Sequence, residues 1–365
     1  MPSAELSDRE LRLLRLRSQG LLDETKMGSL TEAASSALAI QAQDVDVGKL
    51  GIRARTTLTE AEAVRLAARQ SVCRSWLMRN TLFLFATRDL AWMRPALFER
   101  PLGPAIRRLG QVGLPPAEVD RLLDLLRERL ARGPLPRPEA RELLLAEVGD
   151  PGESNARIYW TFHAAALRGI LVVRPALERV QTFVAGPAGE EMPRERALGR
   201  LARRFLRGHG PATVDDLAYW AKMTKADART AWENAGRTVD VATERGPMTA
   251  LPGTVDPPAP EGPGVRLLGE WDHFMLSWVD KDLALPTGRV GETGTGVHGI
   301  AGRKTAFADG VAFATWRPRR DGTRIEVEVE PFATVPRGAR AGLEAEVADL
   351  GRFFDADASL KPIRR

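Results

Sequence analysis

The chain has 365 residues, of which 44% are hydrophobic, so it is long enough for several units with apolar cores and too apolar for an intrinsically disordered protein. Its formal net charge is +5, and only seven of its 53 lysine and arginine residues are lysine. Because arginine bonds phosphate through two donors at once, this excess favours nucleic acid as a partner, although a GC-rich genome would produce the same bias.

Capping-box patterns mark helix starts near the N-terminus. Ser7 precedes Glu10, and Thr59 precedes Glu62, by the three residues that this pattern requires. The first of these helices carries regularly spaced leucines and ends at Gly20. The stretches 71–77 and 81–85 then read as two strands. Several helices followed by a hairpin are the order of a winged helix, so residues 1–86 are predicted to form one.

The same order of elements recurs twice. Residues 87–186 form the second predicted winged helix, with helices at 88–98, 115–132, 137–148 and 155–168 and strands at 170–173 and 182–184. Residues 187–250 form the third, with helices at 194–207, 214–223 and 226–235 and a strand at 238–243. Thr213 with Asp216, and Thr224 with Asp227, mark two of these helix starts. The helices that meet at 223–224 are a candidate helix-turn-helix.

Residues 251–365 have a different character. A proline-rich linker at 252–264 precedes strands predicted at 265–268, 274–279, 310–316 and 323–329, and a closing helix is predicted at 337–349. Several short strands indicate a small β-barrel or a curled sheet. The predicted fold class is therefore α+β, with tandem winged-helix (helix-turn-helix) units and a C-terminal small β-barrel.

The segment Gln41-Ala42-Gln43 lies where a helical pattern gives way to an acidic, glycine-containing stretch. Residues two apart lie on the same side of an extended chain but on different sides of a helix, so both amides can share a target only outside regular helix. An amide can hold and polarise a water molecule, but it does not titrate near neutrality. The segment therefore fits an undemanding hydrolysis, or simply a polar helix end.

The glycine-rich segment 291–302 reads as a hairpin tip that could approach a ligand or a DNA groove, or as a loop without function. His298, with Arg303 and Lys304 just after the segment, could touch phosphates there. A single cysteine, Cys73, excludes an internal disulfide, and the four histidines show no zinc-binding spacing, so no metal is predicted. No stretch is apolar for long enough to span a membrane, and we expect a soluble, cytoplasmic protein.

Five stretches together resemble the AlkZ-like winged-helix DNA glycosylases over nearly the whole chain. They are Gln41-Ala42-Gln43-Asp44, Arg53-Ala54-Arg55, Arg79-Asn80-Thr81-Leu82, residues 267–272 and residues 309–317. The resemblance implies a C-shaped body of tandem winged helices with a β-barrel, and a catalytic Gln-apolar-Gln motif matched by Gln41 and Gln43. The chain departs from the family's Arg-Gly-Thr-Leu-His stretch at Asn80 and Phe83, which could alter the lesion pocket.

The resemblance implies a DNA repair glycosylase that removes N7-alkylguanine from double-stranded DNA, as bulky natural-product adducts or interstrand crosslinks, in antibiotic self-resistance. The enzyme would be monofunctional, free of cofactors and a monomer. Gln41 and Gln43 would position the hydrolytic water, because a cationic alkylated base leaves without a strong acid. Arg53, Arg55, His298, Arg303 and Lys304 are the expected DNA contacts. A non-catalytic winged-helix regulator and a protein-interaction module are the alternatives.

Overall fold

The computed structural model describes residues 5–36, 38–69, 71–148, 154–187, 192–256, 264–286 and 299–363. Its α-helices are α1 (Asp8–Ser18), α2 (Leu30–Ser36), α3 (Val45–Arg55), α4 (Glu60–Ala68), α5 (Leu90–Leu97), α6 (Glu99–Gln111), α7 (Pro116–Ala131), α8 (Arg137–Val148), α9 (Ser154–Leu167), α10 (Arg194–His209), α11 (Val214–Ala221), α12 (Lys225–Glu233), α13 (His273–Leu276) and α14 (Ala339–Phe354). Its strands are β1 (Ile40–Gln41), β2 (Val72–Trp76), β3 (Leu82–Ala86), β4 (Leu135–Pro136), β5 (Leu171–Val173), β6 (Thr182–Ala185), β7 (Val239–Val241), β8 (Met248–Ala250), β9 (Val265–Leu268), β10 (Thr305–Ala308), β11 (Val311–Asp321), β12 (Arg324–Pro331) and β13 (Asp357–Leu360).

The predicted helix starts are confirmed. Ser7, Thr59 and Thr213 each accept a hydrogen bond from the backbone N–H three residues on, and the carboxylate of that residue accepts from the N–H of the cap residue, which completes a capping box. The side chain of Thr224 also accepts from the backbone of Asp227 at the start of α12. Each cap satisfies N–H groups that the first turn of a helix leaves without partners.

The hairpins of the first two predicted units join in one sheet. Its six strands lie in the order β1-β3-β2-β5-β6-β4, and Arg74 of β2 is opposite Val173 of β5. Strands from either side of the predicted boundary at 86–87 are therefore neighbours in space. Three separate winged-helix units, and the boundaries given for them, remain predictions.

The C-terminal part is an open, curled sheet rather than a closed barrel. Its five strands lie in the order β13-β12-β11-β10-β9, so β13 and β9 form its edges. Leu343, Val347 and Leu350 of α14 form one buried apolar cluster with Trp316 and Val327 of the sheet. This half-barrel corrects the predicted barrel, because the helix, and not further strands, covers the apolar face.

The stretch 274–279, predicted to be a strand, begins instead as the short helix α13. Asp272 accepts a hydrogen bond from the backbone N–H of Phe274 at 2.9 Å and caps this helix. Apolar residues here fit the spacing of a helix as well as that of a strand, so their periodicity alone could not distinguish the two structures. The cap decides for the helix.

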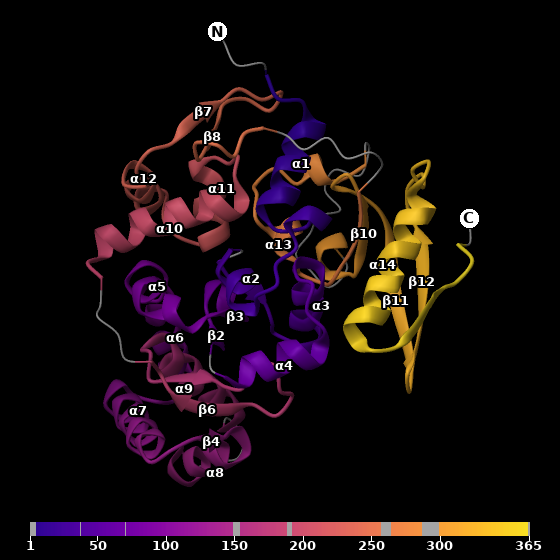
Figure 1. Cartoon of the computed structure of the whole chain (residues 1–365). Coiled ribbons are helices and arrows are strands. Elements are labelled where there is room, and N and C mark those ends of the chain that lie inside the picture. The colour runs from indigo at the N-terminus through magenta and orange to yellow at the C-terminus, as the bar shows by residue number, and fades with distance from the viewer. Residues whose placement is uncertain are drawn as a thin grey trace.

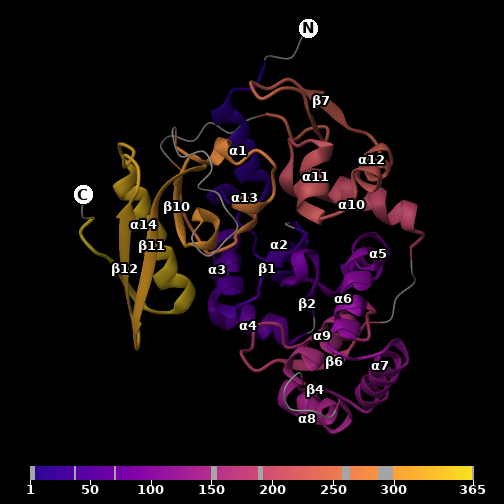
Figure 2. The same ribbon diagram turned by 180° about the vertical axis from the view of Figure 1, so that it is seen from behind.

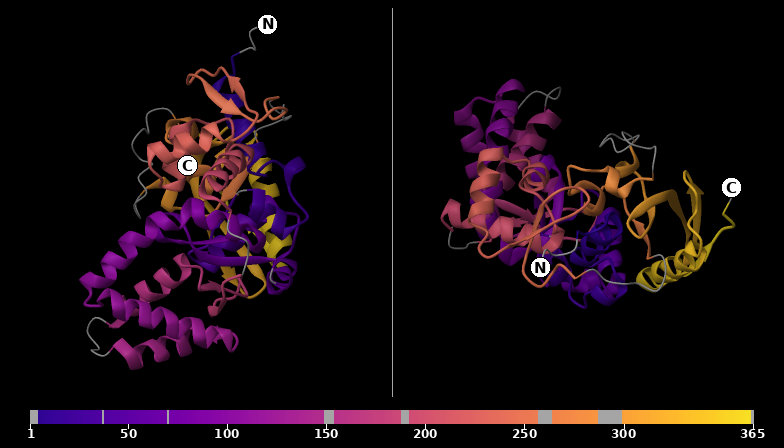
Figure 3. Two further views of the ribbon diagram at one scale, coloured as in Figure 1. Left: turned by 90° about the vertical axis from the view of Figure 1, so that its left-hand side faces the viewer. Right: turned by 90° about the horizontal axis from the view of Figure 1, so that it is seen from above.

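The N-terminal elements lie between the two ends of the molecule (Figures 1 and 2). Helices α1 to α3 have α10 to α12 on one side and the half-barrel with α14 on the other. The view from above shows the same separation (Figure 3). Any group held by α2, α3 and β1 is therefore surrounded by segments that are distant in the sequence.

Candidate active site

The Gln41-Ala42-Gln43 segment forms the edge of the six-stranded sheet just before α3. Gln41 lies opposite Phe83 in the antiparallel pair of β1 and β3, and the N–H of Ala42 donates to the carbonyl of Leu82 at 2.9 Å. Asp44 follows in extended conformation and caps α3 by accepting from Asp46 at 2.7 Å. Gln41 thus lies in a strand, outside regular helix, and the backbone bends at Gln43 and Asp44 before α3 begins.

Hydrogen bonds to the backbone fix both amide groups. Gln41 Oε1 accepts from the N–H of Gln43 at 3.3 Å, and Gln43 Oε1 accepts from the N–H of Leu82 at 2.9 Å. Because an amide oxygen has two lone pairs, each oxygen keeps one for a further donor. Gln41 is only 6% exposed, whereas Gln43 is exposed. The pair therefore reaches from the interior to the surface.

A small hollow lies against Gln41. Gly51 and Arg55 of α3 and the loop that contains Glu270 and Asp272 line it, and it has room for about one water molecule. A side chain at residue 51 would come within 2.6 Å of Ile40, so glycine there lets α3 pack closely against β1. Phe83, the departure from the family pattern, is buried with its ring 5.5 Å from that of His273.

Arg55 supports this hollow and does not face solvent. Its two terminal nitrogens each donate to Asp272 at 2.8 Å, and one also donates to Gln19 at 3.0 Å. Burial acts to raise the pKa of Asp272, but the nearby Arg55 guanidinium outweighs it and holds that pKa below its ordinary value. Asp272 therefore stays ionised beside the hollow.

Glu270 is a candidate that the sequence reasoning did not single out. One of its carboxylate oxygens contacts Lys304 Nζ, while Oε2 is buried and has no partner among the described residues. A buried carboxylate oxygen without a donor is costly, so such groups often mark functional sites. Its only sequence signal was its place in the 267–272 stretch that resembles the family.

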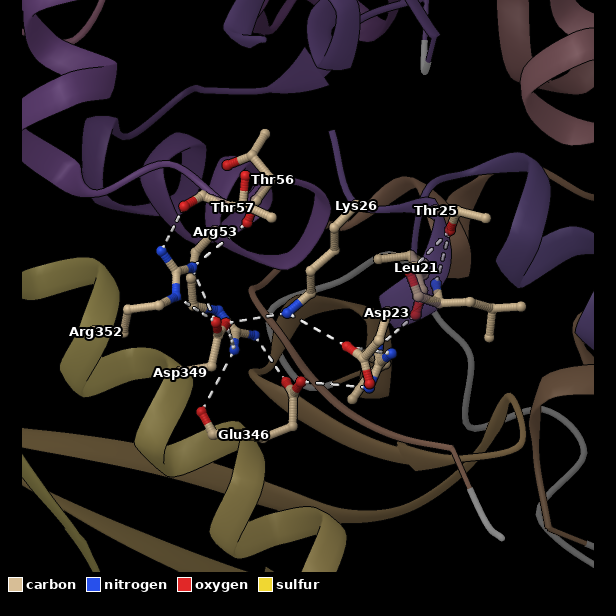
Figure 4. Close-up of polar contacts among 12 residues, drawn as sticks. Leu21, Asp23, Thr25, Lys26, Arg53, Thr56, Thr57, Glu346, Asp349 and Arg352 are labelled. Atoms are coloured by element: carbon tan, nitrogen blue, oxygen red, sulfur yellow. Dashed lines mark hydrogen bonds and ion pairs between the residues drawn. The ribbon is translucent and has the colours of Figure 1, made fainter. Parts of the chain in front are cut away.

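Arg53, expected to touch DNA, is buried in an ion-pair network instead. It is 0% exposed, and its terminal nitrogens lie 3.0 Å from Glu346 and 3.0 Å from Asp349 of α14 (Figure 4). Burial acts to lower the pKa of Arg53, but these carboxylates hold it above the ordinary value. The structure therefore corrects the predicted DNA contact for Arg53, and for Arg55, because both guanidinium groups face carboxylates in the interior.

The other predicted DNA contacts remain at the surface or outside the described residues. Arg303 is exposed, and Lys304 pairs with Glu270. Together with Arg317 they line an open hollow beside the half-barrel. His298 lies outside the residues that the structure describes, as does most of the glycine-rich segment.

Other kinds of site are not found in the described part of the chain. It contains no group of three or more histidine, cysteine, aspartate or glutamate residues that could hold a metal ion. None of its helices is long and apolar enough to cross a membrane. Burial raises the pKa of the Cys73 thiol to about 12, so this cysteine is no nucleophile near neutral pH.

Comparisons with known proteins agree with the sequence resemblance. A family model described as DNA glycosylase AlkZ-like matches residues 34–353. The fold is similar to that of Streptomyces sahachiroi DNA glycosylase AlkZ, with a TM-score of 0.80 and 22% sequence identity over 98% of this chain and 99% of that one. No curated protein sequence matches the chain.

Proposed function

The chain belongs to the AlkZ-like DNA glycosylase family, and we propose that it removes N7-alkylguanine from double-stranded DNA by hydrolysing the N-glycosidic bond. That it is a DNA glycosylase, and therefore acts on DNA, follows from the family. The lesion, the water-positioning mechanism and the catalytic residues are our proposal. Because the chain belongs to an enzyme family, we set aside the alternatives of a non-catalytic regulator and a protein-interaction module.

The observation that carries the proposal is the fixed pair of amides at the end of β1. Each oxygen is oriented by a backbone N–H group and keeps a free lone pair that can accept from a water molecule, and we assign one water to both. Alkylation at N7 makes the guanine cationic, so it leaves as a neutral base. Water adds to the anomeric carbon as the glycosidic bond breaks, and its proton passes to solvent.

Carboxylates near the amides suit this reaction. The sugar develops positive charge as the base departs, and fixed negative groups stabilise such charge strongly where water is excluded. Arg55 binds both oxygens of Asp272, whereas Glu270 pairs with Lys304 through one oxygen and its other oxygen has no partner among the described residues. Glu270 is therefore the carboxylate that we assign to this electrostatic role.

Lys49, the lysine nearest to the amides in the sequence, is already engaged in an ion pair. A lysine that forms a Schiff base must first lose its proton. Lys49 Nζ lies 2.6 Å from Glu60 Oε1, so this amine is already held in an ion pair. We therefore propose hydrolysis by water and expect no covalent complex with DNA after borohydride reduction.

Incubation with duplexes that carry one defined lesion tests the proposal. N7-methylguanine, a bulky N7 adduct and an N7-linked crosslink are compared with unmodified guanine, and the released base is identified by mass spectrometry. Release of intact alkylguanine, absent with Gln41→Ala, supports the proposal. Release of other damaged bases but no alkylguanine would refute the lesion class while leaving the glycosylase assignment in place.

A further inference from the structure

Three positive side chains from separate segments surround the ring of Tyr219 on α11. Lys222 Nζ and Lys281 Nζ lie 4.6 Å and 4.5 Å from the ring centroid, and the guanidinium carbon of Arg79 lies 5.7 Å from it. We call these four residues the Tyr219 cluster. Lys222 directly follows α11, and Lys281 lies in the segment that follows α13. These two helices lie side by side in Figures 1 and 2. The N–H of Val279 also donates to Asp216 of α11 at 2.8 Å.

No carboxylate pairs with these cations among the described residues. Arg79 donates to the carbonyl of Leu276 at 3.3 Å, and Lys281 contacts the carbonyl of Trp278. Arg79 Nη1 is buried and has no partner in the part of the chain that the structure describes. Arg53 and Arg55 show the contrast, since each of these buried arginines is bound by carboxylates. The Tyr219 cluster thus has positive charge that no carboxylate of the described residues pairs with, and this charge is available to an anion.

Mutual repulsion also favours an anion here. Burial, and after it repulsion from Arg79, lower the pKa of Lys281 to about 7, although Asp216 opposes this shift. Burial, and then Arg79, also lower the pKa of Lys222. A bound anion would offset both the desolvation and the repulsion. Asp216 cannot fully neutralise these cations, because its carboxylate already caps α11 and accepts from the N–H of Val279.

The cluster adjoins the candidate active site through one hairpin. Arg79 lies in the turn between β2 and β3 with φ of 58°, a left-handed conformation that non-glycine residues rarely adopt. The same hairpin supplies the Leu82 N–H that orients Gln43. Arg79 and Lys222 also line a hollow of about 290 Å³, whose wall includes residues of α5 and α6 and the carboxylates of Glu99 and Asp227.

We propose that the Tyr219 cluster binds a backbone phosphate of the DNA strand that presents the lesion to Gln43. A phosphodiester carries one negative charge and several acceptor oxygens, which suits cations held at one point. The phosphate would fix the register of the strand and carry no sequence information. The inference rests on DNA being the substrate, but it does not depend on which base is removed.

The test measures binding to an undamaged, fluorescently labelled duplex by anisotropy between 50 and 200 mM salt. Lys222→Gln removes the exposed cation of the cluster. Its control is Lys225→Gln, because Lys225 is also exposed, lies on the next helix and pairs with Asp215 at 3.0 Å. Arg79→Gln is a second variant, and thermal denaturation checks that all of them fold.

Loss of one phosphate contact should make the plot of log affinity against log salt shallower by about 0.9 and weaken binding about fivefold to tenfold near 100 mM salt. Lys222→Gln and Arg79→Gln should both show this, while Lys225→Gln should match the wild type. Equal slopes for Lys222→Gln and the control would overturn the inference.

Inorganic phosphate serves as the second arm. If phosphate raises the melting temperature of the wild type but not of Lys222→Gln, and the DNA slopes are the same, the cluster binds free phosphate and the DNA assignment is wrong. Absence of base release from every lesion would refute the proposed reaction without affecting these slopes, so the two failures can be told apart.

Discussion

Replacing Gln43 by alanine separates what this amide does for catalysis from what it does for stability. In the folded protein Gln43 is exposed, and its oxygen accepts one hydrogen bond, from the Leu82 N–H at 2.9 Å. Losing such a bond costs about 1 kcal/mol. For 365 residues the entropy of unfolding is about 0.8 kcal/mol per kelvin, so the melting temperature should fall by only about 1–2 °C.

The effect on base release should be far larger. An oriented group that acts on the developing charge or on the attacking water is typically worth about 10²- to 10³-fold in rate. Gln43→Glu is the matched control, because the glutamate side chain has the same length and can accept from both the Leu82 N–H and a water molecule. We expect it to retain base release within about tenfold of the wild type, a difference of about 1.4 kcal/mol.

The assay is single-turnover release of N7-methylguanine from a duplex with enzyme in excess, so that binding does not limit the rate. Circular dichroism gives the melting temperatures of the same preparations. Base release by Gln43→Ala within threefold of the wild type would remove Gln43 from the mechanism. A fall of many degrees in melting temperature would instead show that the bond to Leu82 holds the sheet edge together.

Three further predictions concern the groups around the site. Glu346→Ala leaves Arg53 and the Leu267 N–H without this carboxylate, so the free energy of unfolding should fall by about 3–5 kcal/mol in urea titrations; a loss below 1 kcal/mol would contradict the structural role of the network. The pKa of Lys281 lies at about 7 in the folded protein, below its ordinary 10.5. The charged amine therefore destabilises the folded state fully below pH 7, and this cost disappears as the pH approaches 10.5. Lys281→Met should therefore raise the melting temperature more at pH 6 than at pH 9, and an equal change at both pH values would refute this. Glu270→Gln should slow base release about tenfold, equivalent to one charge-assisted contact of about 1.5 kcal/mol, with little change in melting temperature; an unchanged rate would exclude Glu270 from charge stabilisation.

Local signals in the sequence predicted the features that depend on neighbouring residues. The caps at Ser7, Thr59, Thr213 and Thr224 were all correct, because a capping box is complete within four residues. For Gln41 the sequence left an extended segment and a polar helix end open, and the structure places this residue in β1. Where two local patterns competed, as at 274–279, the prediction was wrong.

Partners far apart in the sequence could not be predicted in this way. Arg53 and Arg55 were predicted to contact DNA, but the carboxylates that bind them lie 293 and 217 residues further along the chain. The Tyr219 cluster likewise gathers side chains from three segments. Nothing within a few residues of an arginine reveals whether folding will bring a carboxylate to it.

The sequence by itself therefore determined the type and the starts of most elements, the amide pair and the family, because these reside in short stretches of chain. Only the tertiary structure decided which charges are buried as ion pairs, which remain available to an anion, and that Glu270 lies beside Gln41. The physical reason is that the energy of a charge depends on its distance from other charges and from water, and folding sets both distances.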